Sequence, residues 1–185
     1  FQYPNTTTSG AWSTGNDLNS SREYGTGTGV DSTAVLIWAG YPNSALTEQY
    51  NGVNWTEVND LNTARRYPGA AGTSTAALGF GGGIPITGKT EKWNGTNWTE
   101  VNDLNTSRRS SGGTGIITAG LVFGGANPPD DSPSALTESY NGTNWTEVND
   151  LNTARRNMGG AGTQTSALAF GGTIPPGTNV TELWN

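Results

Sequence analysis

The sequence contains no histidine and no cysteine. It therefore cannot form a disulfide, a thiolate nucleophile, an imidazole general base or a zinc site of the usual kind. Charged residues make up only 13% of the chain and hydrophobic residues only 32%. Because most enzyme chemistries lack their usual residues here, we expect no catalytic residue, no metal site and no cofactor.

Long apolar runs and an excess of positive charge are also missing. The longest apolar run covers six residues, 34–39, whereas a helix needs roughly 20 to cross a bilayer. The net charge is −6, and binding to phosphate groups requires a basic surface. The sequence therefore predicts neither a membrane span nor a nucleic-acid partner, and it shows no pattern of a signal peptide.

What the chain has in abundance is glycine, threonine and asparagine. The 28 glycines and the many Thr and Asn residues favour short strands joined by tight turns. A length of 185 residues fits one domain. We therefore expect a single all-β domain over residues 1–185.

Four internal repeats dominate the sequence. The segment NGTNWTEVNDLNT occurs at 94–106 and again, unchanged, at 141–153, while NGVNWTEVNDLNT lies at 51–63 and the more divergent SGAWSTGNDLNS at 9–20. The repeats are anchored by tryptophans spaced 43, 43 and 47 residues apart, namely Trp12, Trp55, Trp98 and Trp145.

Other residues recur in register with these tryptophans. An arginine follows ten residues later in every unit, at Arg22, Arg65, Arg108 and Arg155. An apolar run then ends in small residues, as LIWAG at 36–40, LGFGG at 78–82, LVFGG at 121–125 and LAFGG at 168–172, so that the last three units end this run at Gly82, Gly125 and Gly172. Each unit closes with Thr-Glu-x-aromatic-Asn.

Each unit reads as an antiparallel meander of four strands. The first strand follows the arginine, the second is the apolar run, the third is the Thr-Glu-x-aromatic segment and the fourth is the NWTEV segment. Asn-Gly pairs at 51–52, 94–95 and 141–142 join the third strand to the fourth. Asn-Gly between two strands is the strongest short hairpin signal because both residues tolerate positive φ.

These units resemble kelch repeats of β-propellers. The shared features are the paired glycines that end an apolar strand, the aromatic residue after Thr-Glu, the tryptophan about five residues later and the arginine about ten beyond it. The first unit departs from the pattern, since Ala39 replaces the first glycine and Glu23 the second arginine of the pair. The resemblance implies a β-propeller of four-stranded antiparallel blades.

The order of strands favours about four blades. The chain starts with a lone fourth strand around Trp12 and stops after a third strand at Asn185. We therefore expect the N-terminal strand to complete the last blade. Two alternatives remain open: a part of a ring of six to eight blades, or two chains that share one ring.

The repeated residues fit structural roles. The four tryptophans are expected to pack between strands rather than to stack on sugars. The repeated arginines are expected to bind backbone carbonyls or the repeated glutamates Glu48, Glu91, Glu138 and Glu182, although they could also bind anionic ligands. The NDLN tetrads could offer oxygens to calcium, but one carboxylate per loop is few for that ion, and Asx turns are the simpler interpretation.

The repeats differ most between the second and third strands. The chain there reads YPNSAL at 41–46, GIPITGK at 83–89, ANPPDDSPSAL at 126–136 and TIPPGTNV at 173–180. Loops that vary on a rigid scaffold commonly carry recognition, and proline lowers the entropy cost of binding. The predicted binding residues on this face are Tyr41, Asn43, Ile84, Ile86, Asn127, Asp130, Asp131, Ile174 and Asn179.

The sequence thus favours a binding or adhesive module without catalysis, which presents these loops to a protein or glycan partner. The alternative is a multivalent propeller lectin with one sugar pocket per blade. An enzyme similar to the kelch-type copper oxidases is disfavoured, because their site needs His and Cys. Near-identical arrays rich in Thr, Asn and Gly resemble those of surface and tail proteins of bacteria and phages, which implies an extracellular, cell-surface or virion location. We also expect a homo-oligomer or a larger assembly, since unsealed sheet edges pair readily.

Overall fold

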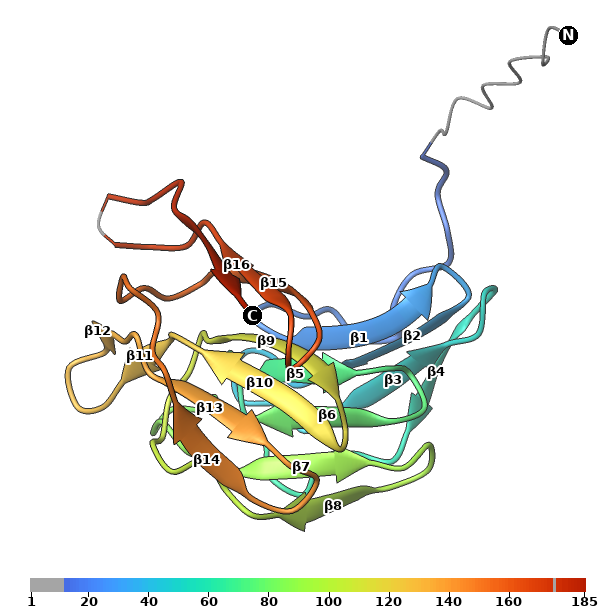
Figure 1. Cartoon of the computed structure of the whole chain (residues 1–185). Coiled ribbons are helices and arrows are strands. Elements are labelled where there is room, and N and C mark those ends of the chain that lie inside the picture. The colour runs from blue at the N-terminus through green and yellow to red at the C-terminus, as the bar shows by residue number, and fades with distance from the viewer. Residues whose placement is uncertain (1–11, 175) are drawn as a thin grey trace, which may run out of the picture.

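A computed structural model describes residues 12–174 and 176–185. These residues contain strands, turns and loops but no helix. Four antiparallel sheets follow one another along the chain and stand around a common centre as the blades of a four-bladed β-propeller (Figure 1). The predicted fold class is confirmed.

The blades are numbered 1 to 4 in chain order. Blade 1 consists of β1 (Thr26–Asp31), β2 (Ala34–Trp38), β3 (Thr47–Tyr50) and β4 (Trp55–Val58). Blade 2 consists of β5 (Gly69–Gly72), β6 (Ala77–Phe80), β7 (Thr90–Trp93) and β8 (Trp98–Val101). Blade 3 consists of β9 (Gly112–Ile116), β10 (Ala119–Phe123), β13 (Thr137–Tyr140) and β14 (Trp145–Val148), with a small hairpin of β11 (Ala126–Asn127) and β12 (Ser132–Pro133) beside it. Blade 4 has three strands, β15 (Gly159–Gly162), β16 (Ala167–Phe170) and β17 (Thr181–Trp184).

The Asn-Gly turns form the predicted hairpins between third and fourth strands. In blade 1 the side-chain oxygen of Asn51 accepts hydrogen bonds from the backbone N–H groups of Val53 and Asn54, each 2.9 Å long. Gly52 has a φ of +91°, a conformation that costs glycine little. Blades 2 and 3 repeat the arrangement at Asn94 and Asn141.

In blades 2, 3 and 4 the second strand ends in a pair of glycines, and the second glycine of the pair lies close to another segment of the backbone. Gly82 has a φ of +89°, and a Cβ atom there would lie 2.8 Å from the carbonyl oxygen of Arg66. Gly125 and Gly172 meet the carbonyls of the next two blades in the same way. Glycine at this position therefore allows the loop after the second strand to pack against the segment that leads into the first strand of the same blade.

Outer-strand tryptophans form the core between neighbouring blades. Trp98 of blade 2 is 5% exposed, its ring centroid lies 5.0 Å from that of Trp38 in blade 1, and its Nε1 donates to Thr47 Oγ1 over 3.1 Å. Trp145 of blade 3 contacts Phe80 and donates to Thr90 in blade 2 in the same manner. The predicted packing role is confirmed for these two tryptophans, whereas Trp55 is only half-buried.

Repeated arginines and glutamates form ion pairs inside the blades, as the repeat pattern predicts. The four pairs are Arg22–Glu48, Arg65–Glu91, Arg108–Glu138 and Arg155–Glu182. The NDLN tetrads supply further partners for the same glutamates. Asn62, for example, donates to Glu91 from both its backbone and its side chain, while the tetrad aspartate Asp103 accepts from the backbone of Thr90. The oxygens considered for calcium are thus used inside the fold.

The last blade differs from the prediction. Blade 4 has no fourth strand, residues 12–25 form no strand, and Trp12 is fully exposed. The predicted completion of this blade by the strand around Trp12 is therefore wrong for the described residues, and residues 1–11 lie outside them. The residues that follow Trp12 are instead held on blade 1, where Asn19 donates to Glu48, and the described residues around Trp12 pair with no strand of blade 4.

Contacts between inner strands join successive blades. Among the inner strands, β1 contacts β5, β5 contacts β9, and β9 contacts β15. Within the described part of the chain, β15 and β1 make no contact of similar extent. Among the described inner strands, β1 and β15 thus each make a contact of this extent with only one other inner strand.

Candidate binding face

The variable loops and the NDLN links lie on the same face of the propeller. The leucine of each link donates its backbone N–H to a carbonyl in the variable loop of the blade that the link leaves, at 3.0 Å from Leu61 to Ala45, 2.9 Å from Leu104 to Gly88 and 3.0 Å from Leu151 to Ala135. The Asn-Gly turns occupy the opposite ends of the strands. We call the side with the variable loops the loop face.

A ladder of backbone hydrogen bonds crosses the centre of the loop face. It joins residues that stand two positions after each repeated arginine, namely Tyr24, Tyr67, Ser110 and Asn157. The N–H groups of Tyr67, Ser110 and Asn157 donate to the carbonyl of the equivalent residue in the preceding blade, over 2.8, 3.0 and 2.8 Å respectively. All four have a φ between 55° and 59°. The ladder therefore brings together side chains that are separated by a whole repeat in the sequence.

Aromatic side chains gather where blades 1 and 2 meet on this ladder. The rings of Tyr24 and Tyr67 lie 4.4 Å apart, and Tyr41 from the first variable loop stands edge-on to Tyr24 at 6.5 Å. Tyr24 and Tyr41 are about half exposed, at 50% and 56%. Their arrangement leaves aromatic surface open to solvent on the loop face.

Arginines stand over these rings. The guanidinium of Arg66 lies 5.0 Å from the ring centroid of Tyr41 and 5.7 Å from that of Tyr67, and Arg109 lies 4.9 Å from Tyr67. Such cation–π contacts hold a guanidinium without neutralising its charge. Among the described residues no carboxylate forms an ion pair with Arg66.

The neighbouring charges are neutralised by the loop of blade 3. Asp131 accepts from Arg109 over 2.8 and 2.5 Å and from Arg156 over 2.6 Å. The hydrogen bond from Arg109, supported by the charge of Arg156, holds the pKa of Asp131 below its usual value against a smaller effect of burial. The same hydrogen bond raises the pKa of Arg109. Asp131, Arg109 and Arg156 therefore form an ion-pair network on this part of the loop face. Arg66 is not part of this network.

The structure brings some of the predicted binding residues together. Asn43 donates to the carbonyl of Ile84 over 3.1 Å, and a shallow hollow between the two loops is lined by Pro42, Asn43, Arg66 and Ile84. These four residues and the three tyrosines form one surface from blades 1 and 2. We call this surface the Tyr-Arg patch; its residues are Tyr24, Tyr41, Pro42, Asn43, Arg66, Tyr67 and Ile84.

The remaining predicted residues lie elsewhere on the loop face. Asp131 joins the arginine network next to the patch, and Asp130 is exposed beside it. Ile86 and Asn127 are half-buried within their own loops, while Ile174 is half-buried and Asn179 exposed on the loop of blade 4. These residues do not join the patch.

Tyr24, Tyr67, Arg66, Arg109 and Arg156 were not among the residues expected to bind. A signal for them exists in the sequence, because the residue two positions after the repeated arginine is Tyr, Tyr, Ser and Asn in units that otherwise barely differ. The second arginine of each pair is likewise Glu23 in the first unit. Variation outside the obvious loops thus also marks this face.

Comparisons with known proteins add no assignment to this picture. The sequence matches no protein-family model and no curated protein. In the part of the chain that the structure describes, no group of three or more His, Cys, Asp or Glu side chains is placed to hold a metal ion. No helix there has the length and apolar character needed to cross a membrane.

Proposed function

We propose that this chain is a non-catalytic binding or adhesion module of kelch-like repeats that presents its loop face to a protein or glycan partner. The observation that carries the proposal is the Tyr-Arg patch, where exposed tyrosines and an unneutralised arginine from two blades meet on the face on which the repeats differ. We further propose an extracellular, cell-surface or virion location, on the resemblance of the repeats to surface and tail proteins of bacteria and phages.

The chemistry of the patch suits such a partner. Aromatic rings stack on the apolar faces of sugars or on partner side chains, and tyrosine and arginine are enriched at the centres of protein interfaces. The guanidinium of Arg66 offers donors for hydroxyl or carboxylate groups. The stacked arrangement of Tyr24, Tyr41 and Tyr67 also limits the side-chain entropy lost on binding.

A multivalent lectin with one sugar pocket per blade is the second candidate. It needs equivalent side chains in every blade, yet the ladder positions carry Tyr24, Tyr67, Ser110 and Asn157. The repeated scaffold supports this candidate, whereas the differences at its centre favour a single asymmetric site.

The full chain should be tested on a glycan array and against candidate surface proteins. We expect Tyr41→Ala and Arg66→Ala each to weaken binding of the identified ligand about tenfold or more, which corresponds to about 1.4 kcal/mol. Val53→Ala is the matched control, because Val53 is exposed on the opposite side of blade 1, in the Asn-Gly turn. Equal affinity of all three variants and the unchanged chain would contradict a site on the loop face.

A further inference from the structure

Four equivalent residues stand where the chain enters each blade on the loop face. Each follows a repeated arginine, and its backbone carbonyl accepts a hydrogen bond from the first residue of the variable loop in its own blade, over 2.6 to 2.8 Å. The backbone therefore holds this position in the same way in every blade. The four residues are Glu23, Arg66, Arg109 and Arg156, and their donors are Tyr41, Gly83, Ala126 and Thr173.

Two of the three arginines show what this position binds. Nε and Nη2 of Arg109 donate to Oδ1 and Oδ2 of Asp131 over 2.8 and 2.5 Å, which is the two-point geometry typical of a guanidinium and a carboxylate. Nη1 of Arg156 donates to the same carboxylate over 2.6 Å. The loop of blade 3 thus supplies one carboxylate to two arginines of the set.

Arg66 occupies the same position without such a partner. The two variable loops beside it, 41–46 and 83–89, contain no Asp or Glu, and no carboxylate of the described residues forms an ion pair with it. Its buried Nε also has no hydrogen-bond partner among them. The rings of Tyr41 and Tyr67 contact the guanidinium but do not neutralise its charge. Arg66 is therefore a carboxylate-binding position whose carboxylate the described residues do not supply.

The hollow at Arg66 has the size and composition of a small-ligand site. Its volume is about 410 Å³, and such sites commonly measure about 300–1,000 Å³. Pro42 and Ile84 line it with apolar groups, and Asn43 adds a polar one. Asn43 uses its Nδ2 to donate to Ile84, and its side-chain oxygen can accept a hydrogen bond from a hydroxyl group. The hollow thus combines a cation, a hydroxyl acceptor and apolar surface.

We propose that the Tyr-Arg patch binds an acidic sugar, a hexuronic or sialic acid residue of a glycan, with the sugar carboxylate on Arg66. This inference rests on the proposed function and names its ligand class. The carboxylate has at Arg66 the role that Asp131 has at Arg109. A hydroxyl group of the sugar donates to Asn43, and the apolar face of the sugar ring packs on Tyr41.

Charge and area favour an acidic glycan over other anionic partners. The net charge of −6 repels a nucleic acid, whose binding requires a basic surface. A protein partner usually covers about 20–30 residues on each side, whereas the Tyr-Arg patch has seven residues and borders on arginines that Asp131 already neutralises. A ligand that brings one carboxylate together with hydroxyl groups therefore fits the patch best.

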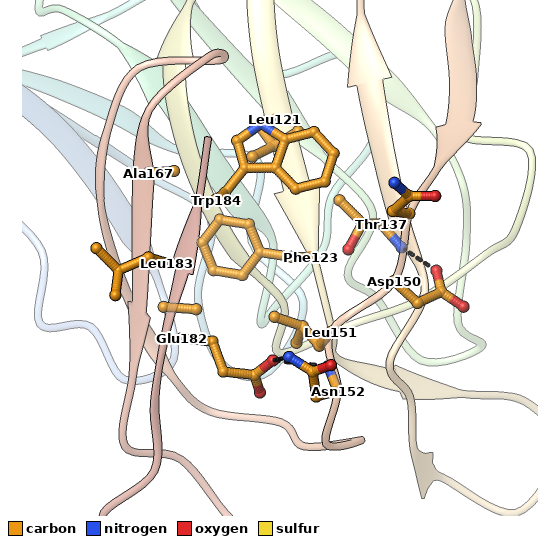
Figure 2. Close-up of a pocket in the computed structure, with 12 residues that line it drawn as sticks. Leu121, Phe123, Thr137, Asp150, Leu151, Asn152, Ala167, Glu182, Leu183 and Trp184 are labelled. Carbon is orange, nitrogen blue, oxygen red and sulfur yellow. Dashed lines mark hydrogen bonds between the residues drawn. The ribbon is translucent and has the colours of Figure 1, made fainter.

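The pocket between blades 3 and 4 has the opposite character. Figure 2 shows apolar side chains such as Phe123 around it. Its carboxylates are already engaged, because Asp150 accepts from the backbone of Thr137 over 3.0 Å and Glu182 accepts from the side chain of Asn152 over 2.8 Å. The described residues that line it include no arginine or lysine. This pocket therefore does not suit an acidic sugar.

Calorimetric titration of the full chain with matched oligosaccharides tests the proposal. The probes are oligogalacturonate against the same oligosaccharide with methyl-esterified carboxyl groups, and sialyllactose against lactose. We expect at least one acidic probe to bind about tenfold or more tightly than its neutral counterpart. Arg66→Gln should abolish this preference. Lys92→Gln is the matched control, since it removes one positive charge from β7 outside the patch, and it should keep the preference.

A second variant should strengthen binding, which a folding defect cannot imitate. Glu23 is exposed and stands at the position of Arg66 in the preceding blade. Its negative charge opposes the approach of an anion to the patch. Glu23→Gln is therefore expected to increase the affinity for the acidic probe about threefold and to leave the affinity for the neutral probe unchanged.

Three results would overturn the proposal. The first is equal affinity for acidic and neutral probes, or binding to none of them. The second is an equal loss of affinity in Arg66→Gln and Lys92→Gln, which would indicate attraction by net charge alone. The third is an Arg66-dependent preference for an acidic peptide over both acidic probes. If Tyr41→Ala still weakens binding of a neutral glycan or a protein, the proposed function stands and only the ligand class is wrong.

Discussion

At the residue scale, buried arginine–glutamate pairs hold each blade to the link that enters it. Arg108 and Glu138 are both almost fully buried, and Glu138 also accepts from the backbone and side chain of Asn105 and from the backbone of Thr106. Burial lowers the pKa of Arg108, while the charge of Glu138 opposes this effect. The carboxylate is therefore stable in the interior only while its partners remain.

Replacing Arg108 should show this dependence. Arg108→Ala leaves the charge of Glu138 buried without its strongest partner, and we expect the free energy of unfolding to fall by about 3–5 kcal/mol in chemical denaturation. Lys89→Ala is the control, because the Lys89–Glu100 pair is largely exposed and such pairs contribute at most about 1 kcal/mol. Similar losses in the two variants would argue against a special role of the buried pair.

The sequence predicts these pairs but not the Tyr-Arg patch. Arg65 and Glu91 recur in every unit at fixed positions, so their pairing can be read from the repeat. Tyr24 and Tyr67 come together only because a backbone ladder joins equivalent residues of neighbouring blades. No local pattern in one unit encodes that contact, because it forms between two different blades.

At the element scale, the strands of the complete blades follow the predicted segments and turns. The segment around Trp12 carries a similar local pattern, yet residues 12–25 form no strand. A strand is stabilised by cross-strand pairs and burial more than by its own propensity. The same sequence pattern therefore gives β8 where β7 lies beside it, and no strand where no partner edge is at hand.

The outer-strand tryptophans allow a matched test of this dependence on neighbours. Trp98→Ala empties the contact between blades 1 and 2, and we expect a loss of about 3–5 kcal/mol in the free energy of unfolding. Trp55→Ala removes the same residue from the same repeat position, but Trp55 is half-buried and its described aromatic contact is with Tyr50 of its own blade. Its effect on the monomer should be less than half as large, measured by urea denaturation at low protein concentration.

An equal loss from Trp55→Ala would contradict this account. It would mean that the outer strand is stabilised mainly within its own blade, through contacts such as that of Trp55 with Tyr50 at 5.0 Å. The comparison holds the residue type and the strand sequence WTEV constant. The main difference is that Trp98 packs on Trp38 of another blade, whereas Trp55 contacts Tyr50 of its own blade.

At the scale of the whole molecule, stability is shared unevenly along the row of blades. In repeat proteins it is approximately the sum of each unit's own stability and its contacts with neighbours. The inner strands of blades 2 and 3 make extensive contacts on both sides, whereas β15 of blade 4 makes one on one side only, and the described part of blade 4 has three strands. Blade 4 also leaves Phe170 and Leu183 exposed, so it gains the least from burial.

Native-state hydrogen exchange should therefore resolve blade 4 from the rest. In the monomer at low concentration, we expect the hydrogen-bonded amides of β15, β16 and β17 to exchange at least about tenfold faster than those of β6 and β10, because local opening of a terminal unit costs less than global unfolding. Amides of β6 are the control, since this strand is buried along its whole length. Equal protection in all four blades would instead indicate a single cooperative ring, closed between blade 4 and blade 1.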